Sequence, residues 1–308
     1  MVIYNYMHVR AAHWCPVQYT RVARTCTTKP LKTMIHGTRH AVFWDVKRDV
    51  PTIIDDICPH RGASLSEGGV VTEGGCIKCK YHGKHVGPRQ ADLRGVTESN
   101  GIVWLKSGLG ELPPHEKNPP TSDEFEGNRV IEYSRAFDGC SPILCVENTL
   151  DWSHLETVHA FHLIEGKPNV TINRGGVNGK ASYEYAFLKD QTLVIENEFW
   201  GPWSTCLRFI FDGKRAFTLH FAVRPESKNK ARLFVRVVRD ASSWSGPIGD
   251  FVYMLINELP LIEDRYIVRH ADPTSWSKNK LTKDDAFLKE YRLYMTTCHP
   301  DILAMYVS

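Results

Sequence analysis

The sequence lacks several features that would assign it to a familiar class at once. No apolar run approaches the length of about 20 residues that crosses a bilayer. The formal net charge is only +3 over 308 residues, which gives no basic surface for nucleic acid. The opening MVIYNYMHVRAAHWCPV has no apolar segment typical of a signal peptide. We therefore expect a soluble cytoplasmic protein that binds neither nucleic acid nor a membrane.

Two further absences concern redox chemistry. The nine cysteines are odd in number and scattered, so they do not form a regular disulfide framework. They are instead typical of free or metal-bound thiols in a reducing compartment. No Gly-x-Gly-x-x-Gly opens a βα unit, so the sequence shows no fingerprint of a nicotinamide or flavin site. Any electrons that the protein uses must then come from a separate protein.

The hydrophobic pattern predicts an α+β protein with two domains, residues 1–115 and 116–308. Short β-rich runs such as AVFWDV and GIVWLKSG fill the first, and a linker rich in proline and charge, Gly110 to Asn128, follows. In the second, AFTLHFAV and ARLFVRVVRD predict an antiparallel hairpin. PILCVENTLDWSHLETVHAF, KDDAFLKEYRLYM and GDFVYMLINELPLIEDRYIVRH predict helices, the last interrupted at Pro260. We expect an antiparallel sheet packed against helices.

A glycine-rich segment holds two mixed pairs of metal ligands. Cys58-x-His60 is followed after eighteen residues by Cys79-x-x-His82. Zinc fingers usually pair cysteine with cysteine and histidine with histidine, whereas here each pair has one of each. Mixed pairing suits a Rieske [2Fe–2S] centre, in which two thiolates hold one iron and two imidazoles the other. If Cys76 were the ligand in place of Cys79, the Cys-x-x-His pairing with His82 would be lost, so Cys76 is predicted to be a small buried loop residue.

Together with CPHRGA and CKYHG, this segment resembles the Rieske domain of the Rieske non-haem iron oxygenases. The similarity runs from HWCPV through VFWDV and covers about the first third of the chain. The resemblance implies that Cys58 and Cys79 hold the inner iron of the cluster. It assigns the outer iron to His60 and His82, and His85 is expected to be a solvated spare.

A second constellation lies in VENTLDWSHLETVH, which holds His154 and His159. Two imidazoles and one carboxylate can hold Fe(II) and leave open positions for O2. Residues five apart on a regular helix are rotated by about 140°, so the two imidazoles would diverge. We therefore expect a local irregularity, such as a π-bulge, between them. Two satisfied core histidines are the alternative.

Asn148-x-x-Asp151-x-x-His154-x4-His159 matches the mononuclear iron motif of the same oxygenase family. The resemblance places the third ligand in LIEDRYIV, at Asp264. Asp250 is the alternative carboxylate, and Glu263 is expected to be a solvated neighbour. His162 is a less favoured alternative to His159.

The resemblance also implies an assembly and an activity. In the family, the residue at the position of Asp151 bridges to a Rieske histidine of the next subunit, here His82, within a ring-shaped homotrimer. A separate ferredoxin or NAD(P)H-dependent reductase supplies electrons, for which Arg61, Lys80 and Lys84 could help to dock an acidic partner. The chain would use O2 at Fe(II) to hydroxylate or demethylate a small organic molecule, with dioxygenation less favoured for so short a chain. The helix-grip-like second domain would hold the catalytic iron.

The rival hypothesis is an electron-transfer protein, in which a Rieske domain is fused to a ligand-binding domain without mononuclear iron. The substrate pocket is expected between the iron helices and the sheet. Its candidate lining residues are Phe161, Trp200, Trp203, Phe209, Phe211 and His220.

Overall fold

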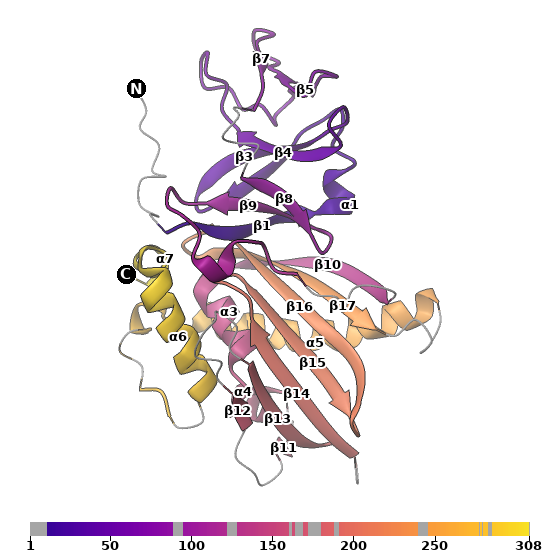
Figure 1. Ribbon diagram of the computed structural model, residues 1–308, viewed down its shortest axis with the longest axis vertical. Coiled ribbons are helices and arrows are strands. Elements are labelled where there is room, and N and C mark those ends of the chain that lie inside the picture. The colour runs from indigo at the N-terminus through magenta and orange to yellow at the C-terminus, as the bar shows by residue number, and fades with distance from the viewer. Residues whose placement is uncertain are drawn as a thin grey trace.

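The structure of the protein is a computed structural model. The structure describes residues 11–88, 95–121, 128–159, 162–163, 169–171, 180–187, 191–239, 246–276, 278, 280–282 and 285–307. A β-rich domain lies at one end of the long axis and a large sheet with helices at the other (Figure 1). This is the α+β architecture that the sequence predicts.

The N-terminal domain contains three small antiparallel sheets, ordered β1-β9-β8, β2-β3-β4 and β5-β6-β7. A short helix, α1 (Thr20–Ala23), follows the first strand. The strands are β1 (His13–Tyr19), β2 (Leu31–Ile35), β3 (Thr38–Asp45), β4 (Val50–Asp55), β5 (Val70–Val71), β6 (Ile77–Lys78), β7 (His85–Val86), β8 (Val96–Ser99) and β9 (Ile102–Ser107). AVFWDV and GIVWLKSG thus form strands as expected, because their apolar side chains are buried.

The segment between the domains has no strand among its described residues. Its one regular element is a 3₁₀ turn, η2 (Pro114–Glu116). Glu116 in this turn is buried and meets His299 and Tyr294 near the C-terminus. The proline-rich run therefore packs onto the second domain.

The C-terminal domain is built on one eight-stranded antiparallel sheet, ordered β10-β17-β16-β15-β14-β13-β11, with β12 paired to β13. The strands are β10 (Arg129–Asp138), β11 (His162–Leu163), β12 (Asn169–Thr171), β13 (Lys180–Phe187), β14 (Gln191–Phe199), β15 (Ser204–Phe211), β16 (Lys214–Ser227) and β17 (Lys230–Arg239). The predicted hairpin is confirmed as β16–β17, in which Leu219 faces Val237.

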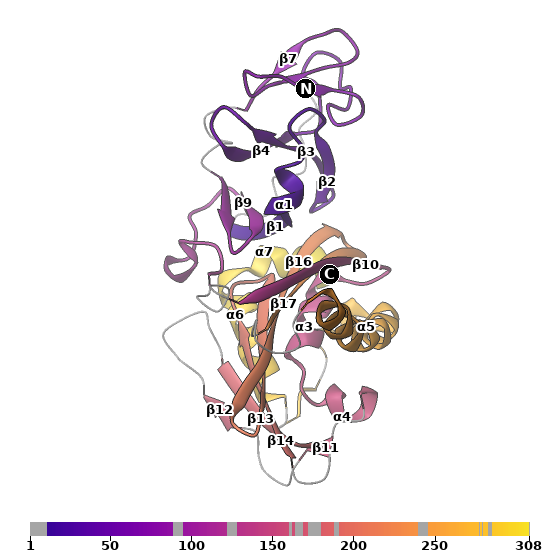
Figure 2. The ribbon, with the colours of Figure 1, turned by 90° about the vertical axis from the view of Figure 1, so that its right-hand side faces the viewer.

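Helices cover this sheet and hold the site. They are α3 (Pro142–Leu150), α4 (His154–Val158), α5 (Pro247–His270), α6 (Ala286–Cys298) and α7 (Pro300–Val307), with a 3₁₀ turn η4 (Pro273–Ser275). Helix α3 packs against β14 to β17 and contacts α5, α6 and α7. Figure 2 shows α3, α4 and α5 on one side of the sheet.

The predicted interruption at Pro260 is wrong, since α5 continues through it to His270. Proline removes one backbone hydrogen bond. Here α5 packs against β10 and α3 along its length. This tertiary packing keeps the helix continuous, so that Asp264 follows Pro260 by one helical turn.

Candidate iron centres

The two Cys/His pairs sit on loops of matching backbone geometry. The N–H of Cys58 donates to the Ala63 carbonyl (2.7 Å), and the Gly62 N–H donates back to Cys58 (2.8 Å). Cys79 repeats both bonds with Lys84 (2.8 Å) and Gly83 (2.9 Å).

Both of these glycines have left-handed φ angles, 72° for Gly62 and 69° for Gly83. Side chains disfavour such angles, so glycine is suited to these tight loops. Two equivalent loops therefore present the two ligand pairs.

The four side chains fit a [2Fe–2S] cluster. Both cysteines are buried, while His60 and His82 are exposed, with ring centroids 4.6 Å apart. A hydrogen bond from the Tyr81 backbone lowers the pKa of Cys79, and a contact with Cys58 adds to this. The loops therefore favour a thiolate at Cys79, which is the form that binds iron. The donor set of two sulfurs and two imidazoles is the one a Rieske centre requires.

The spare residues of this segment lie outside the set of four. Cys76 is half-buried, not buried as predicted, and its Sγ lies 3.7 Å from the Gly74 carbonyl. It is less buried because the loop before β6 reaches the surface. His85 is exposed, as expected. All nine cysteines are free thiols.

The second set of ligands depends on a break in the predicted helix. α3 ends at Leu150, Asp151 is extended (φ −80°, ψ 110°), and α4 begins at His154. The expected π-bulge is wrong, because α4 is an ordinary α-helix as far as Val158. The irregularities instead lie before His154 and at His159, whose backbone leaves the helical region (φ −106°, ψ 7°). His154 and His159 thus occupy the two ends of one short helix.

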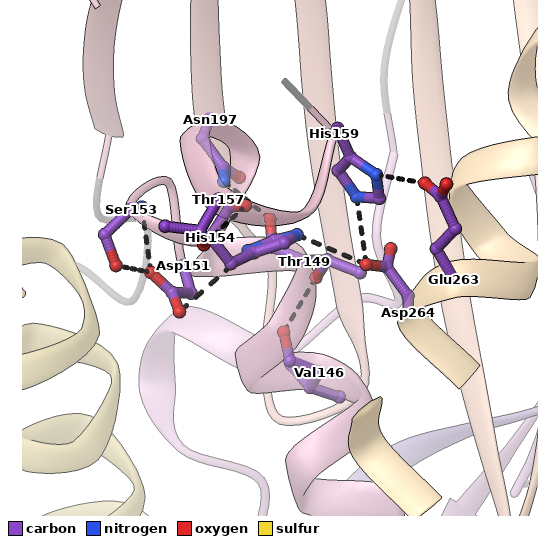
Figure 3. A network of polar contacts seen from close by, with 10 residues as sticks. All are labelled: Val146, Thr149, Asp151, Ser153, His154, Thr157, His159, Asn197, Glu263 and Asp264. Carbon is purple, nitrogen blue, oxygen red and sulfur yellow. Dashed lines mark hydrogen bonds and ion pairs between the residues drawn. The ribbon is translucent and has the colours of Figure 1, made fainter. Parts of the chain in front are cut away.

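His154, His159 and Asp264 converge, with their ligating atoms within 4.8 Å of one another. The Nε2 atoms of His154 and His159 lie 3.3 Å and 3.0 Å from Oδ1 of Asp264 (Figure 3). Both ring nitrogens of His154 are buried and make no well-formed hydrogen bond within the described residues, so their contacts with Asp264 and Asp151 are ion-pair contacts only. A metal ion would supply the missing partner of Nε2. The three residues fit the facial arrangement that holds non-haem Fe(II).

The charged and titratable groups at this site shift one another's pKa. Burial alone would raise the pKa of Asp264, but the two imidazoles beside it lower the pKa to about 2. Burial alone would lower the pKa of His159, but Asp264 and Glu263 raise it above its usual value. Asp264 is thus ionised near neutral pH, as a metal ligand must be.

Glu263 is a functional contact that the sequence reasoning missed. It is half-exposed, yet its Oε2 lies 2.8 Å from Nδ1 of His159. An acceptor on the second nitrogen of a ligand histidine fixes the tautomer and leaves Nε2 for the metal. Glu263 is solvated as expected, but the sequence did not predict its contact with His159. The two adjacent acids in LIEDRYIV could have suggested this contact, since neighbouring side chains can contact different atoms of one imidazole.

The alternative carboxylate, Asp250, forms ion pairs with arginines. Its oxygens meet Arg129 at 2.5 Å and Arg239 at 2.7 Å. These guanidinium groups lower its pKa, with Arg129 contributing most. Asp250 therefore closes an ion-pair network at the start of α5, and Asp264 is the carboxylate that meets the histidines.

The residues before His154 also border this centre. Oδ2 of Asp151 lies 3.9 Å from Nδ1 of His154, and its Oδ1 accepts from the backbone N–H and the hydroxyl of Ser153 (2.9 and 2.7 Å) (Figure 3). Asp151 approaches His154 as expected, but from an extended residue and not from a shared helical face. Asn148 lines the adjoining pocket. His162 lies in β11, beyond the helix.

An apolar pocket of about 480 Å³ opens beside the three ligands. Phe209 and Phe211 line it, as predicted, and Phe209 stacks on Phe217 (4.5 Å, 13°). Trp200, Trp203 and His220 do not, because they pack toward the first domain or within the sheet. Phe161 lies outside the described residues.

Asn197 is a polar residue in the lining of this pocket. Its Nδ2 donates to the Thr149 carbonyl (2.7 Å), which fixes the orientation of the amide. Its Oδ1 is buried and accepts no hydrogen bond within the described residues. No motif in the sequence points to this residue, because its place in the lining depends on β14 passing the end of α3.

Comparison with known proteins agrees with this geometry. Residues 13–104 match the family model of the Rieske [2Fe-2S] domain. Pheophorbide a oxygenase of Oryza sativa subsp. japonica is 39% identical over 185 residues, which are 50% of this chain and 34% of the relative. The oxygenase component of dicamba O-demethylase from Stenotrophomonas maltophilia is 31% identical over 153 residues, 42% of this chain and 43% of the relative. The chain thus spans less than half the length of these curated relatives.

The fold is shared more widely than the sequence. A crystal structure of dicamba monooxygenase bound to dicamba superposes with a TM-score of 0.72, covering 92% of this chain and 96% of the other at 18% identity. At this identity the likeness concerns the fold.

Residues 13–104 are a Rieske [2Fe–2S] domain on the N-terminal side of a mixed sheet-and-helix domain. The chain is similar to the oxygenase components of Rieske oxygenases, as the resemblance in its sequence led us to expect. No described helix is long and apolar enough to cross a membrane.

Proposed function

We propose that this protein is the oxygenase component of a Rieske non-haem iron monooxygenase, which hydroxylates or demethylates a small organic substrate. The observation that carries the proposal is the convergence of His154, His159 and Asp264 beside an apolar pocket. A Rieske domain alone would need neither feature. A protein of the same fold supports this class, since dicamba monooxygenase has been solved with non-haem iron and dicamba.

Each set of ligands has a distinct task in this proposal. Cys58, Cys79, His60 and His82 would hold the cluster, and His154, His159 and Asp264 would hold Fe(II). When bound, the cluster supplies single electrons and the iron supplies open positions for O2. Glu263 holds the proton on Nδ1 of His159 and so keeps Nε2 directed at the metal position.

The pocket indicates the chemistry of the substrate. Its described lining includes aromatic and aliphatic side chains and no lysine or arginine. Apart from the proposed Fe(II), a carboxylate or phosphate would therefore find no counter-ion there, and a neutral apolar molecule would bury its surface well. The substrate class is thus a neutral, largely apolar molecule.

Electron delivery favours an assembly of several chains. In one chain, the cluster loops near β5 and β7 and the iron helix α4 lie at opposite ends of the molecule (Figure 1). His82 is exposed, and Asp151 is partly exposed beside His154. A homotrimer in which His82 of one subunit meets Asp151 of the next would connect the two centres.

Helix α5 offers a surface for such an assembly. Its exposed side carries an apolar stripe at helical spacing, with each residue 44–77% exposed: Ile248, Phe251, Leu255, Leu259, Ile262 and Tyr266. Exposed apolar surface of this extent is typical of protein interfaces.

The electron donor would be a separate ferredoxin or reductase. Exposed His60 and His82 lie at the tip of the first domain, and exposed Arg61, Lys80 and Lys84 lie beside them. A positive rim around the cluster suits an acidic donor protein. The nine free thiols favour a reducing compartment such as the cytoplasm.

Iron content tests the proposal against the electron-transfer alternative. The reconstituted protein is expected to bind about three irons per chain, two in the cluster and one in the second domain. His154→Ala should lose one iron and keep the visible spectrum of the cluster. Oxygen uptake with a surrogate reductase and a panel of neutral aromatic compounds should stop in this variant. About two irons per chain, unchanged by His154→Ala, would favour the electron carrier.

A further inference from the structure

A second group of metal-ligating side chains lies far from both iron centres. His13 and Cys15 on β1 and His36 in the turn between β2 and β3 place their ligating atoms within 4.8 Å of one another. His13 and Cys15 are fully buried, and His36 is partly buried. The proposed oxygenase chemistry uses none of the three.

The three ligating atoms converge on one point. Nε2 of His13 lies 3.0 Å from Nε2 of His36, and Sγ of Cys15 lies 3.2 Å from the same atom. Around a tetrahedral zinc ion, bond lengths of about 2.0–2.1 Å to nitrogen and about 2.3 Å to sulfur separate such atoms by roughly 3.3–3.6 Å. A small outward movement of the side chains would therefore make room for an ion.

The opposite nitrogens of both imidazoles are held by oxygen atoms of the protein. Nδ1 of His13 lies 3.3 Å from the Ala11 carbonyl, and Nδ1 of His36 lies 2.7 Å from the Tyr306 hydroxyl. A carbonyl can only accept, so His13 carries its proton on Nδ1 and has a lone pair on Nε2. Such contacts to the second nitrogen accompany metal-binding histidines.

Burial favours the metal-binding form of the two imidazoles but not that of the thiol. Burial lowers the pKa of His13 well below its usual value and that of His36 to about 3, so both rings are neutral, which is the ligand form. Burial also raises the pKa of Cys15, although Arg224 opposes this. Without an ion the thiol stays protonated and unreactive, which argues against a catalytic cysteine.

The backbone at His36 is unusual. His36 and Gly37 have φ angles of 48° and 77° and form the two-residue turn between β2 and β3. Such turns favour Asn-Gly, because most side chains disfavour a left-handed φ at the first position. The turn places the imidazole against β1.

The cluster joins three parts of the molecule. The N–H groups of His36 and Gly37 donate to Pro225 (2.7 Å) and Glu226 (2.8 Å) of β16 in the second domain. Tyr306 comes from α7, which lies next to β1 (Figure 1). An ion at this place would tie the Rieske domain to the sheet and to the C-terminal helix.

We propose that His13, Cys15 and His36 form a structural zinc site that fastens the Rieske domain to the catalytic domain. Two imidazoles and one thiolate suit zinc and disfavour magnesium or calcium, which prefer oxygen ligands. His299 supplies a further nitrogen ligand near His13. Its ring centroid lies 5.9 Å from that of His13, and its buried Nδ1 has no hydrogen-bond partner within the described residues. It is the candidate for the fourth ligand that structural zinc sites usually have.

The competing explanation is a hydrogen-bonded polar core. A proton on Nε2 of His36 could be donated to Nε2 of His13, while the Tyr306 hydroxyl donates to Nδ1 of His36. This arrangement needs no ion and predicts a zinc content at background. Metal analysis therefore separates the two explanations.

The test is made on the whole iron-loaded protein, purified without chelator from medium supplemented with zinc. We expect about one zinc per chain, with zinc K-edge X-ray absorption showing sulfur at about 2.3 Å and nitrogen at about 2.0–2.1 Å. Zinc that had replaced iron at His154, His159 and Asp264 would show no sulfur ligand. Background zinc, a sulfur-free shell, or copper at these ligands instead would each overturn the proposal.

Variants connect the zinc to these residues. His36→Asn removes the imidazole but suits the left-handed turn, and Cys15→Ala removes the thiolate. Both should lose the zinc while the iron content and cluster spectrum stay unchanged, and their melting temperature should fall. Cys26→Ala, which alters another buried thiol of the same domain, is the matched control and should keep the zinc. Zinc retained in His36→Asn and Cys15→Ala would also overturn the proposal, independently of the oxygenase function.

Discussion

Nδ1 of His159 lies 2.8 Å from Oε2 of Glu263, while Nε2 of the same ring lies 3.0 Å from Asp264. Adjacent residues of α5 therefore contact the two nitrogens of one imidazole. In the proposed iron site, Asp264 would bind the metal together with the ring, and Glu263 would orient the ring through its other nitrogen.

Glu263→Ala should weaken iron binding at the second centre by about 10- to 100-fold, because His159 loses the acceptor that fixes its tautomer. Glu263→Gln keeps an acceptor and should be affected less. Iron titration of the cluster-loaded protein measures both. Glu258→Gln, on the same helix but paired with Arg135, is the control. Equal iron affinity in Glu263→Ala and the control would contradict the orienting role.

Asp264→Asn should remove the mononuclear iron and leave the fold intact, since the amide is a poor ligand of similar shape. Asp250→Asn should do the reverse. It removes the carboxylate that contacts Arg129 and the buried Arg239, at a cost of about 1–3 kcal/mol of stability, and keeps the iron. Iron content and denaturant unfolding separate the two variants. If Asp250→Asn lost the iron and Asp264→Asn kept it, Asp250 and not Asp264 would be the iron ligand.

Leu259→Glu should dissociate the proposed homotrimer, because it places a charge within the exposed apolar stripe of α5. Leu293→Glu changes a comparably exposed leucine on α6 and is the control. Sedimentation analysis gives the mass of each variant. Cluster reduction followed by oxygen uptake should slow with dissociation in Leu259→Glu. A protein that is monomeric before any substitution would contradict the trimer.

Stability should fall in acid between about pH 6.5 and pH 4, because buried histidines stay neutral in the folded protein. Burial lowers the pKa of His220 to about 3 and that of His40 to about 4. The unfolded chain takes up these protons first as the pH falls, so each group costs up to about 1.4 kcal/mol per pH unit in this window. Denaturant unfolding at several pH values measures the slope.

His220→Gln should make this slope shallower, since one of the buried titrating groups is removed. His85→Gln, at an exposed position, should leave it unchanged. A slope that is the same in His220→Gln as in the control would show that other groups determine the acid sensitivity.

The sequence alone was enough to propose the ligands of both candidate iron sites. Ligand types and their spacing are local properties, so Cys58, His60, Cys79 and His82 could be proposed from one short segment. Strands such as β3 and the hairpin β16–β17 were predictable for the same reason, because alternation and burial leave a periodic pattern. The two domains followed from the proline-rich segment between them.

Tertiary structure decided what depends on elements far apart in the chain. The sequence left Asp250 as an alternative to Asp264, and the packing of α5 shows that Asp264 meets the histidines whereas Asp250 meets two arginines. The helix break at Asp151 and the continuity of α5 through Pro260 also reverse local propensity. His36 meets His13 and Cys15 because a two-residue turn folds back onto β1. Such contacts leave no periodic signal in the sequence, since they are fixed by packing between distant segments.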